Sequence, residues 1–168
     1  MKRMFFMLLL ILETMTSVFA QENARQWNAG VTLGYGTDVS KGFVGVRAMY
    51  HIKPAFSLAA GFNYYFKRTL DTKPFEVEGK YWDINLDFHW NAFRGNAYKL
   101  YPLIGLTYLH TKASVAGFSI SDGEAGLNLG LGGQWDFAER WGAAAEAKYQ
   151  AYTGGGQFVP SVSLMYRF

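Results

Sequence analysis

The chain has 168 residues and contains no cysteine. That absence excludes a disulfide scaffold, a cysteine-ligated metal site and a lipid anchor attached through cysteine. Charged residues make up only 17% of the chain, whereas soluble domains usually carry about a quarter. The net charge is +3 and there is no run of basic residues, so nothing in the sequence indicates nucleic-acid binding.

Beyond the first twenty residues, the chain also lacks a continuous apolar run of the ~20 residues that a membrane helix needs. It is rich instead in hydrophobic residues (50%), aromatic residues (18%) and glycine (19 residues). This mixture favours short strands and tight turns over packed helices. The length is sufficient for one domain.

The first twenty residues have the pattern of an export signal. Two basic residues, Lys2 and Arg3, precede an apolar stretch over residues 4–11, and a more polar segment then leads to Ala20. The small residue at position 20 suits signal peptidase, so we expect cleavage between Ala20 and Gln21. The sequence therefore predicts a signal peptide over 1–20 and a mature domain over 21–168. A transmembrane anchor is the alternative, but the apolar stretch is shorter than the ~20 residues needed to span a bilayer.

From Trp27 onward, apolar residues alternate with small or polar ones. In residues 81–90 every even position holds a large apolar side chain, while the odd positions hold Tyr, Asp, Asn, Asp and His. A strand places successive side chains on opposite faces, whereas a helix would mix the two sets around its circumference. The pattern predicts eight strands, over residues 27–36, 43–52, 56–67, 77–92, 98–111, 124–137, 141–151 and 157–168.

The connections between these strands alternate in length. Short turns fall at 53–55, near 94–96 and at 138–140, and the other four connections, at 37–42, 68–76, 112–123 and 152–156, are mostly longer. Short turns at one end and longer loops at the other are typical of transmembrane barrels, with the short turns in the periplasm. With an even strand number, both mature termini are then also periplasmic.

Two features argue against strands at all of the predicted positions. Residues 139–152 have good helix propensity, although Glu146 and Lys148, two positions apart, suit a strand with both charges on its inner face. Pro102 and Pro160 lie inside predicted strands, where a closed barrel has no free edge for a missing N–H. Both prolines lie near predicted strand starts, where the missing N–H is best tolerated.

The composition of the two strand faces predicts which of them faces outward. The second face consists mostly of Gly, Ala, Ser, Thr and Asn with few charges, which is too little polarity for the water-facing side of a soluble barrel. We therefore expect the apolar face to contact lipid. One predicted interfacial girdle consists of Trp27, Trp90, Trp135 and Trp141. A second, at the opposite strand ends, consists of Tyr35, Tyr64, Trp82, Tyr108 and Phe158.

The same alternation places charged side chains inside the barrel. They must be paired there, because burying an isolated charge costs several kcal/mol. Eight strands leave an interior that side chains just fill, so a structural ion-pair network is favoured over a polar permeation path. The predicted network consists of Arg47, Asp83, Asp87, Glu146, Lys148 and Arg167, with Asp136 as a further candidate.

The chain ends in Val162-Ser163-Leu164-Met165-Tyr166-Arg167-Phe168, and residues 101–106 read Tyr-Pro-Leu-Ile-Gly-Leu. With the strand rhythm, these segments resemble the small eight-stranded outer-membrane barrels of the OmpA transmembrane-domain and OmpX type, a porin-like group. The resemblance implies an all-β, eight-stranded antiparallel transmembrane up-and-down β-barrel in the bacterial outer membrane. It also implies that Leu164, Tyr166 and Phe168 form the signal read by the outer-membrane assembly machinery, and that the barrel is a monomer in contact with lipid and lipopolysaccharide.

Three functions remain open at this point: a structural or surface-binding barrel, a narrow channel for small solutes, and a lipid A-modifying hydrolase. The first is favoured. A hydrolase would need a base and a nucleophile at the outer rim. His110 has Thr111, Ser114 and Glu124 nearby, but the His-x-Ser spacing that would put both groups on one strand face is absent. His51, His89 and Asp87 share the interior face, but their spacing does not require a metal. We therefore expect no enzyme activity, no cofactor and no metal.

A group of basic residues near the second outer loop is the remaining candidate for binding. Lys67, Arg68, Lys73 and Lys80 are suited to lipopolysaccharide phosphates. The acidic residues Asp71, Glu76 and Glu78 offset them, so a solvated loop is the favoured interpretation.

Overall fold

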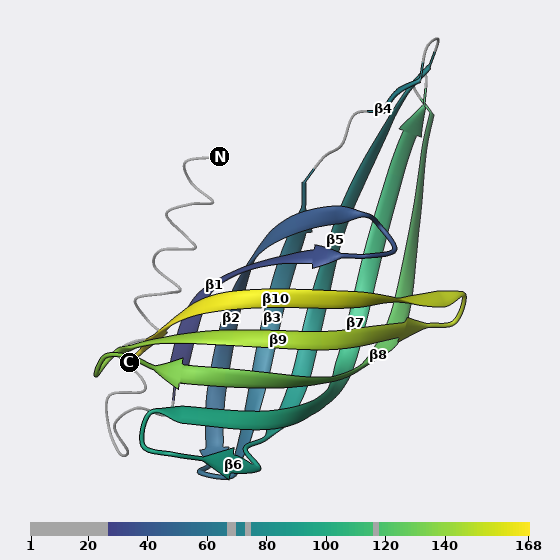
Figure 1. Ribbon diagram of the computed structural model, residues 1–168. Helices are drawn as coiled ribbons and strands as arrows, with labels where there is room; N and C mark the ends of the chain where they lie inside the picture. Colours follow the sequence, from purple (N-terminus) through teal and green to yellow (C-terminus); the bar gives the residue numbers. More distant parts are fainter. Residues whose placement is uncertain (1–26, 67–69, 73–74, 116–117) are drawn as a thin grey trace.

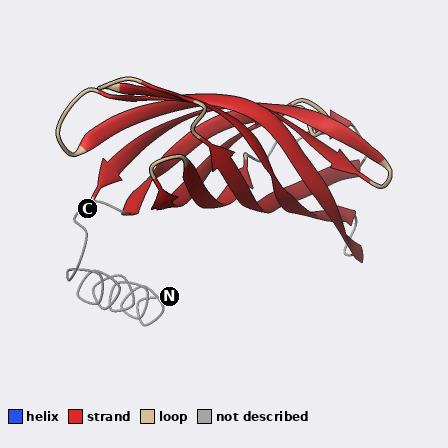
Figure 2. Cartoon of the chain, turned by 90° about the horizontal axis from the view of Figure 1, so that it is seen from below, coloured by secondary structure: helices blue, strands red, loops and turns tan. Residues whose placement is uncertain are grey.

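The computed structural model describes residues 27–66, 70–72, 75–115 and 118–168. The predicted signal peptide and its cleavage site at Ala20 and Gln21 lie outside the described residues. Every described element is a strand or a loop (Figure 2). The described part of the chain contains no helix that is long and apolar enough to cross a membrane.

Eight long strands form a closed antiparallel barrel, and two short strands extend its hairpins (Figure 1). The barrel closes because β1 pairs with β10 and β5 pairs with β7. The strands are β1 (Trp27–Gly36), β2 (Lys41–Lys53), β3 (Phe56–Tyr65), β4 (Leu70–Thr72), β5 (Phe75–Trp90), β6 (Phe93–Arg94), β7 (Tyr98–Val115), β8 (Phe118–Asp136), β9 (Trp141–Tyr152) and β10 (Gly155–Arg167). The predicted all-β, eight-stranded barrel is confirmed.

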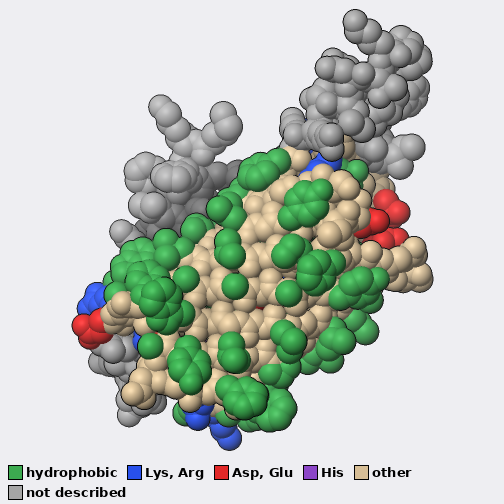
Figure 3. Space-filling view, viewed as in Figure 1, with side chains coloured by type: hydrophobic (Ala, Val, Ile, Leu, Met, Phe, Trp, Pro, Cys, Tyr) green, Lys and Arg blue, Asp and Glu red, His purple; other side chains and the backbone are tan. Residues whose placement is uncertain are grey.

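The apolar face of the strands points outward. Leu131 and Trp135 of β8 are 66% and 60% exposed, whereas Asn128 and Gln134 on the other face are buried. Hydrophobic side chains are spread over the surface seen in Figure 3, and charged side chains lie toward its ends and edges. A soluble protein would not expose this much large apolar surface, so the predicted polarity is confirmed.

Two of the predicted outer loops contain β-structure. The predicted outer loop at 68–76 contains β4 and the start of β5, and the predicted loop at 112–123 contains the end of β7 and the start of β8. These two predictions are wrong because backbone pairing continues where the alternation of side chains fades: β7 and β8 stay paired up to Val115 and Phe118.

The paired strands that result project beyond the rest of the barrel (Figure 1). On its other side β8 pairs with β9 only from Gly126 onward. Residues 118–125 therefore have one neighbour, β7, among the described strands, and they form a free sheet edge outside the closed barrel.

The stretch with helix propensity is a strand. β9 spans Trp141–Tyr152, and its Glu146 and Lys148 are buried inside the barrel as the pattern predicts. Pro160 lies in the middle of β10 rather than near its start, which corrects that expectation. The β1–β10 pairing ends at Gly34 and Ser161, so the missing N–H of Pro160 falls just past the end of this ladder.

Candidate functional site

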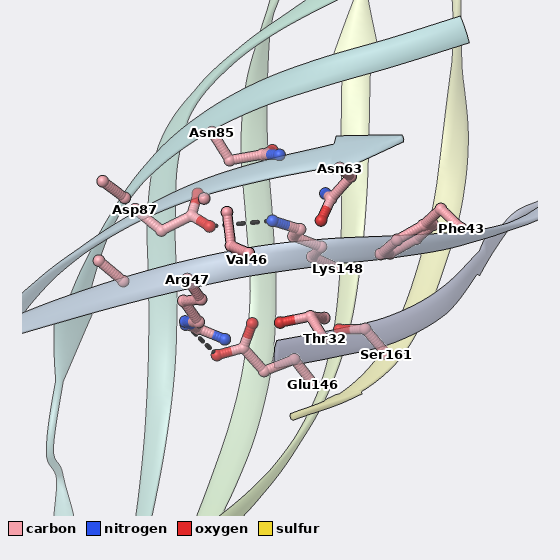
Figure 4. A pocket seen from close by; sticks show the side chains of 13 residues that line it. Thr32, Phe43, Val46, Arg47, Asn63, Asn85, Asp87, Glu146, Lys148 and Ser161 are labelled. Carbon is pink, nitrogen blue, oxygen red and sulfur yellow. Dashed lines mark hydrogen bonds and ion pairs between the residues drawn. The ribbon is translucent and has the colours of Figure 1, made fainter. Parts of the chain in front are cut away.

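Two ion pairs cross the middle of the lumen (Figure 4). Arg47 of β2 donates from Nη2 to Oε1 of Glu146 of β9 at 2.6 Å. Lys148, two residues further along β9, donates from Nζ to Oδ2 of Asp87 of β5 at 2.9 Å. All four side chains are buried, and pairing offsets the cost of removing their charges from water.

Aromatic groups complete the surroundings of the first pair. Tyr101 of β7 donates its hydroxyl hydrogen to Oε1 of Glu146 at 2.7 Å. The ring of His89 stacks on that of Tyr101 with centroids 4.4 Å apart, and its Nε2 lies 3.2 Å from Nη2 of Arg47. Since the guanidinium can only donate, Nε2 is the acceptor and His89 is neutral in this arrangement.

Asp83 has a different environment from the other interior acids. It is fully buried, and its carboxylate accepts hydrogen bonds from Asn63 at 2.7 Å, from the Tyr65 hydroxyl at 2.6 Å and from Asn85. No ion pair joins it to a base among the described side chains. Hydrogen bonds from neutral donors therefore take the place of an ion pair here.

Amide side chains connect these groups into one network. Nδ2 of Asn128 donates to Asp87 at 2.6 Å and lies 2.9 Å from Oδ1 of Asn85, and Gln150 donates to that same oxygen at 2.8 Å. Gln157 donates to Oε1 of Gln150 at 2.7 Å. These amides and Tyr101 are not among the predicted network residues, although all of them occupy the inner face of the alternation.

Little open space is left between the side chains of the lumen. The cavity between the two ion pairs has a volume of about 20 Å³ and is lined by polar groups that include Thr32 and Ser161 (Figure 4). That volume is enough for about one water molecule. The interior is therefore a filled polar core.

At the end of the barrel where β10 finishes lies a group of charged residues that we call the terminal mouth, formed by Arg94, Lys99, Asp136 and Arg167. Arg167 forms an ion pair with Oδ2 of Asp136, and Gln134 donates to Oδ1 of the same carboxylate at 2.6 Å. Of the seven predicted interior residues, four form the two middle pairs, Asp83 is held by neutral donors, and Arg167 pairs with Asp136 at the mouth.

The four tryptophans of the first predicted girdle also lie at this end. Trp90, Trp135 and Trp141 are exposed on the outer surface, and Trp27 is half-buried with its ring 4.8 Å from that of Tyr50. Leu164 and Phe168 point outward as well, and the ring of Tyr166 contacts those of Trp141 and Phe168. The interfacial and assembly roles of these residues stay predictions.

The residues considered for catalysis or metal binding are not brought together. His110 shares the outer face with Trp82, on which its ring stacks at 4.9 Å, while Glu124 is the partner of Leu109 and lies on the opposite face. His51 is held by Asn28 at 3.1 Å and Ser57 at 2.7 Å. Among the described residues, no group of three or more His, Cys, Asp or Glu side chains could hold a metal ion.

Two lysines occupy the outer surface where the projecting strands leave the barrel. Lys80 of β5 is the cross-strand partner of Lys112 of β7, two positions beyond the pair Trp82 and His110. Both lysines are exposed. The other cationic loop residues named from the sequence, Lys67, Arg68 and Lys73, lie outside the described residues.

The solved structures with the same fold include outer-membrane proteins. The chain is 17% identical to Ail of Yersinia pestis, with a TM-score of 0.60, covering 84% of this chain and 96% of that one. It is 16% identical to the N-terminal β-barrel domain of Pseudomonas aeruginosa OprF, with a TM-score of 0.66 and coverages of 87% and 100%. A major outer membrane protein from Thermus thermophilus is 11% identical, with a TM-score of 0.68 and coverages of 87% and 100%.

At such low sequence identities, the structural similarity shows a shared fold and no more. The comparison with curated proteins found no match. The family model described as the outer membrane protein beta-barrel domain matches residues 6–168, which is nearly the whole chain. Together with the apolar outer surface and the closed barrel, this match shows that the chain belongs to the outer membrane protein beta-barrel domain family and is a protein of the bacterial outer membrane.

Proposed function

We propose that this protein is a surface-binding barrel whose outer rim holds lipopolysaccharide through its phosphate groups. The observation that carries this proposal is the position of Lys80 and Lys112 on the outer face of the sheet. Cross-strand partners share one face of a sheet, and Trp82 and His110 lie on that face two residues closer to the barrel centre. The two ammonium groups thus follow directly after the aromatic residues at this end.

The two lysines need an anionic partner. Like charges directly opposite each other on neighbouring strands repel, and the nearby acids of β8 do not offset them on this face. Asp122 and Glu124 pair with Thr111 and Leu109, whose side chains alternate with those of Lys112 and His110, so these carboxylates lie on the other face. Phosphate groups at the membrane surface supply the missing negative charge.

The proposal includes an orientation. The lysine pair and the projecting strands lie on the outer side of the membrane, and the terminal mouth with both mature termini lies in the periplasm. One feature of the described residues supports this: the β-structure extends beyond the rest of the barrel at the end opposite the terminal mouth, and transmembrane barrels have their longer segments on the extracellular side.

Two ion pairs and an amide network fill the lumen of this barrel. Because the side chains leave little open space, solutes have no wide path through it. A channel for small solutes is therefore the less favoured function. In planar bilayers we expect the protein to show no stable, reproducible conductance. A steady conductance that changes on neutralising Arg47 would instead support the channel.

The binding proposal is tested with a double variant, Lys80→Gln with Lys112→Gln. We expect it to bind purified lipopolysaccharide about tenfold more weakly than the unmodified protein, since two charge-assisted contacts are lost. The matched control is Lys53→Gln with Arg140→Gln, which removes two exposed positive charges at the other end of the barrel. Equal affinities of both double variants would reject the proposed site.

The salt dependence of binding gives a second readout. Binding that depends on the lysine pair should weaken as ionic strength rises, because solvent-exposed charges are screened over about 10 Å at 0.1 M salt. The Lys80→Gln, Lys112→Gln variant should show a shallower dependence than the control. Identical salt dependence in the two would contradict a phosphate-binding role for these lysines.

A further inference from the structure

The terminal mouth contains a second pair of like charges on neighbouring strands. Arg94 of β6 and Lys99 of β7 are direct cross-strand partners on either side of a tight turn, in which Gly95 N donates to Tyr98 O at 2.9 Å. Lys99 lies two residues before Tyr101, so its side chain is on the lumen face. Arg94 shares that face because cross-strand partners do so.

A third cation adds to this pair. Arg167 and Arg94 both lie close enough to Lys99 for their charges to act on it, and Asp136 is the acid in the same group. Three positive charges and one carboxylate leave a net charge of +2. Both oxygens of Asp136 are already engaged, by Arg167 and by Gln134.

Lys99 is left without a direct partner in the described part of the chain. Its side chain is half-buried, and no hydrogen bond or ion pair joins it to another described residue. The rest of the lumen shows that this is a local feature, because Arg47 and Lys148 each have a carboxylate within 3 Å. An excess of positive charge at one position of an otherwise balanced interior suggests a bound anion.

We infer that the terminal mouth is a binding site for a phosphate group, held by Arg94, Lys99 and Arg167. The guanidinium groups present parallel N–H donors that match phosphate oxygens, and the ammonium group adds a point charge. A phosphate with up to two negative charges balances the net +2 of the cluster. β6 lies at the lower end of the barrel in Figure 1, and basic side chains are visible at that end in Figure 3.

This phosphate can belong to a soluble molecule or to the headgroup of a phospholipid in the membrane leaflet around the mouth. The site differs from the lysine pair of the outer rim in position, residues and face of the sheet. The inference therefore does not depend on lipopolysaccharide binding, and the two can fail separately.

The first arm of the test uses protein purified from membranes and placed in nanodiscs of phosphatidylcholine. Calorimetric titration with inorganic pyrophosphate should show binding that is about tenfold weaker in Lys99→Gln and in Arg94→Gln. Lys53→Gln is the matched control, since it removes an exposed positive charge at the same end of the barrel and should bind as the unmodified protein does.

The second arm replaces part of the phosphatidylcholine by phosphatidylglycerol and omits pyrophosphate. If the ligand is a lipid headgroup, phosphatidylglycerol raises the urea midpoint of the unmodified protein and of Lys53→Gln but not that of Lys99→Gln. Pyrophosphate binding in the first arm identifies a soluble ligand instead.

The inference is overturned if neither probe acts, or if Lys53→Gln loses as much affinity as Lys99→Gln, which would indicate general electrostatic attraction. If Lys99 instead had a structural role, Lys99→Gln would lower the urea midpoint even in the absence of any anion, because a structural contact would be lost. Here the ligand-free Lys99→Gln protein should be at least as resistant to urea as the unmodified one. If Lys99→Gln does not fold, Arg94→Gln, at an exposed position, provides the same measurement.

Discussion

The middle of the lumen and the terminal mouth use the same kinds of charged residues but balance them differently. In the middle, Arg47 and Lys148 each face a carboxylate, and all four groups are buried. At the mouth, three cations share the single carboxylate of Asp136. The difference follows from access to water, since an unpaired charge costs several kcal/mol in the interior and little at a solvated rim.

This contrast separates structural charges from charges available for binding. A buried ion pair with complementary neighbours has no capacity left for a ligand. An excess of one sign near water lowers stability slightly and can be offset by a ligand of the opposite sign. The following predictions test this division, starting with the largest expected effect.

Truncating an acid in the middle of the lumen should destabilise the barrel strongly. Glu146→Ala leaves Arg47 buried without its carboxylate, and we expect a loss of about 3–5 kcal/mol in the free energy of unfolding. Urea unfolding in lipid bilayers measures this loss. The control Glu139→Ala, in the exposed turn before β9, should cost less than about 1 kcal/mol. Similar losses for both would show that burial does not distinguish the two regions.

Replacing a buried acid that has no cationic partner should lower the free energy of unfolding less. Asp83→Asn keeps the shape of the side chain but replaces one acceptor oxygen by a donor, which opposes the amide and hydroxyl donors of Asn63, Asn85 and Tyr65. We expect a loss of about 1–3 kcal/mol, the cost of an unsatisfied buried polar group. If the same unfolding assay gave a loss as large as that of Glu146→Ala, Asp83 would have to carry an ionic interaction with Lys148.

Outside the lumen, the aromatic contacts at the terminal mouth should contribute less to the stability of the barrel. Phe168→Ala removes the edge-on contact with Tyr166, whose ring centroid is 5.2 Å away, and we expect a loss of about 0.5–1.5 kcal/mol beyond the change in buried area. The predicted assembly role is measured separately, as the yield of folded protein with heat-modifiable gel mobility in outer membranes. An unchanged yield after deletion of Phe168 would contradict that role.

The smallest expected effect is a gain in stability rather than a loss. Lys99→Gln relieves the repulsion from Arg94, and we expect the ligand-free barrel to gain about 0.2–1 kcal/mol. The gain should shrink at high salt because this site is close to water. A loss of stability would mean that Lys99 has a structural partner and that the mouth is balanced like the middle of the lumen.

Much of the fold could be predicted because a strand side chain has only two directions. The alternation around Trp82 and Phe88, and the charges at Glu146 and Lys148 in a stretch with helix propensity, indicated which residues face the interior. The strand extensions over 112–115 and 118–123 could not be predicted, since these residues are held by pairing between β7 and β8 more than by their own alternation. Residues 70–72 and 75–76 are likewise held by pairing, in their case between β4 and β5.

The interior charges were predicted as a set but not as pairs. Sequence order gives no reason to join Arg47 to Glu146 rather than to Asp83, because these residues lie on different strands. The register of the closed barrel makes that choice: it brings β2 opposite β9 across the lumen and leaves Asp83 among amide and hydroxyl donors. The like-charge partners Lys80 with Lys112 and Arg94 with Lys99 are equally a matter of register.

By itself, the amino-acid sequence determined that this chain forms a barrel with an apolar outside and a small, polar inside, because a period of two allows no other division of its residues. It also determined which charges are interior, including the Arg167 beside the outward-facing Phe168. Only the tertiary structure decided which charges neutralise each other and which remain in excess at the two rims. The physical reason is that closing eight strands sets the distances across the lumen, and the Coulomb energy depends on those distances.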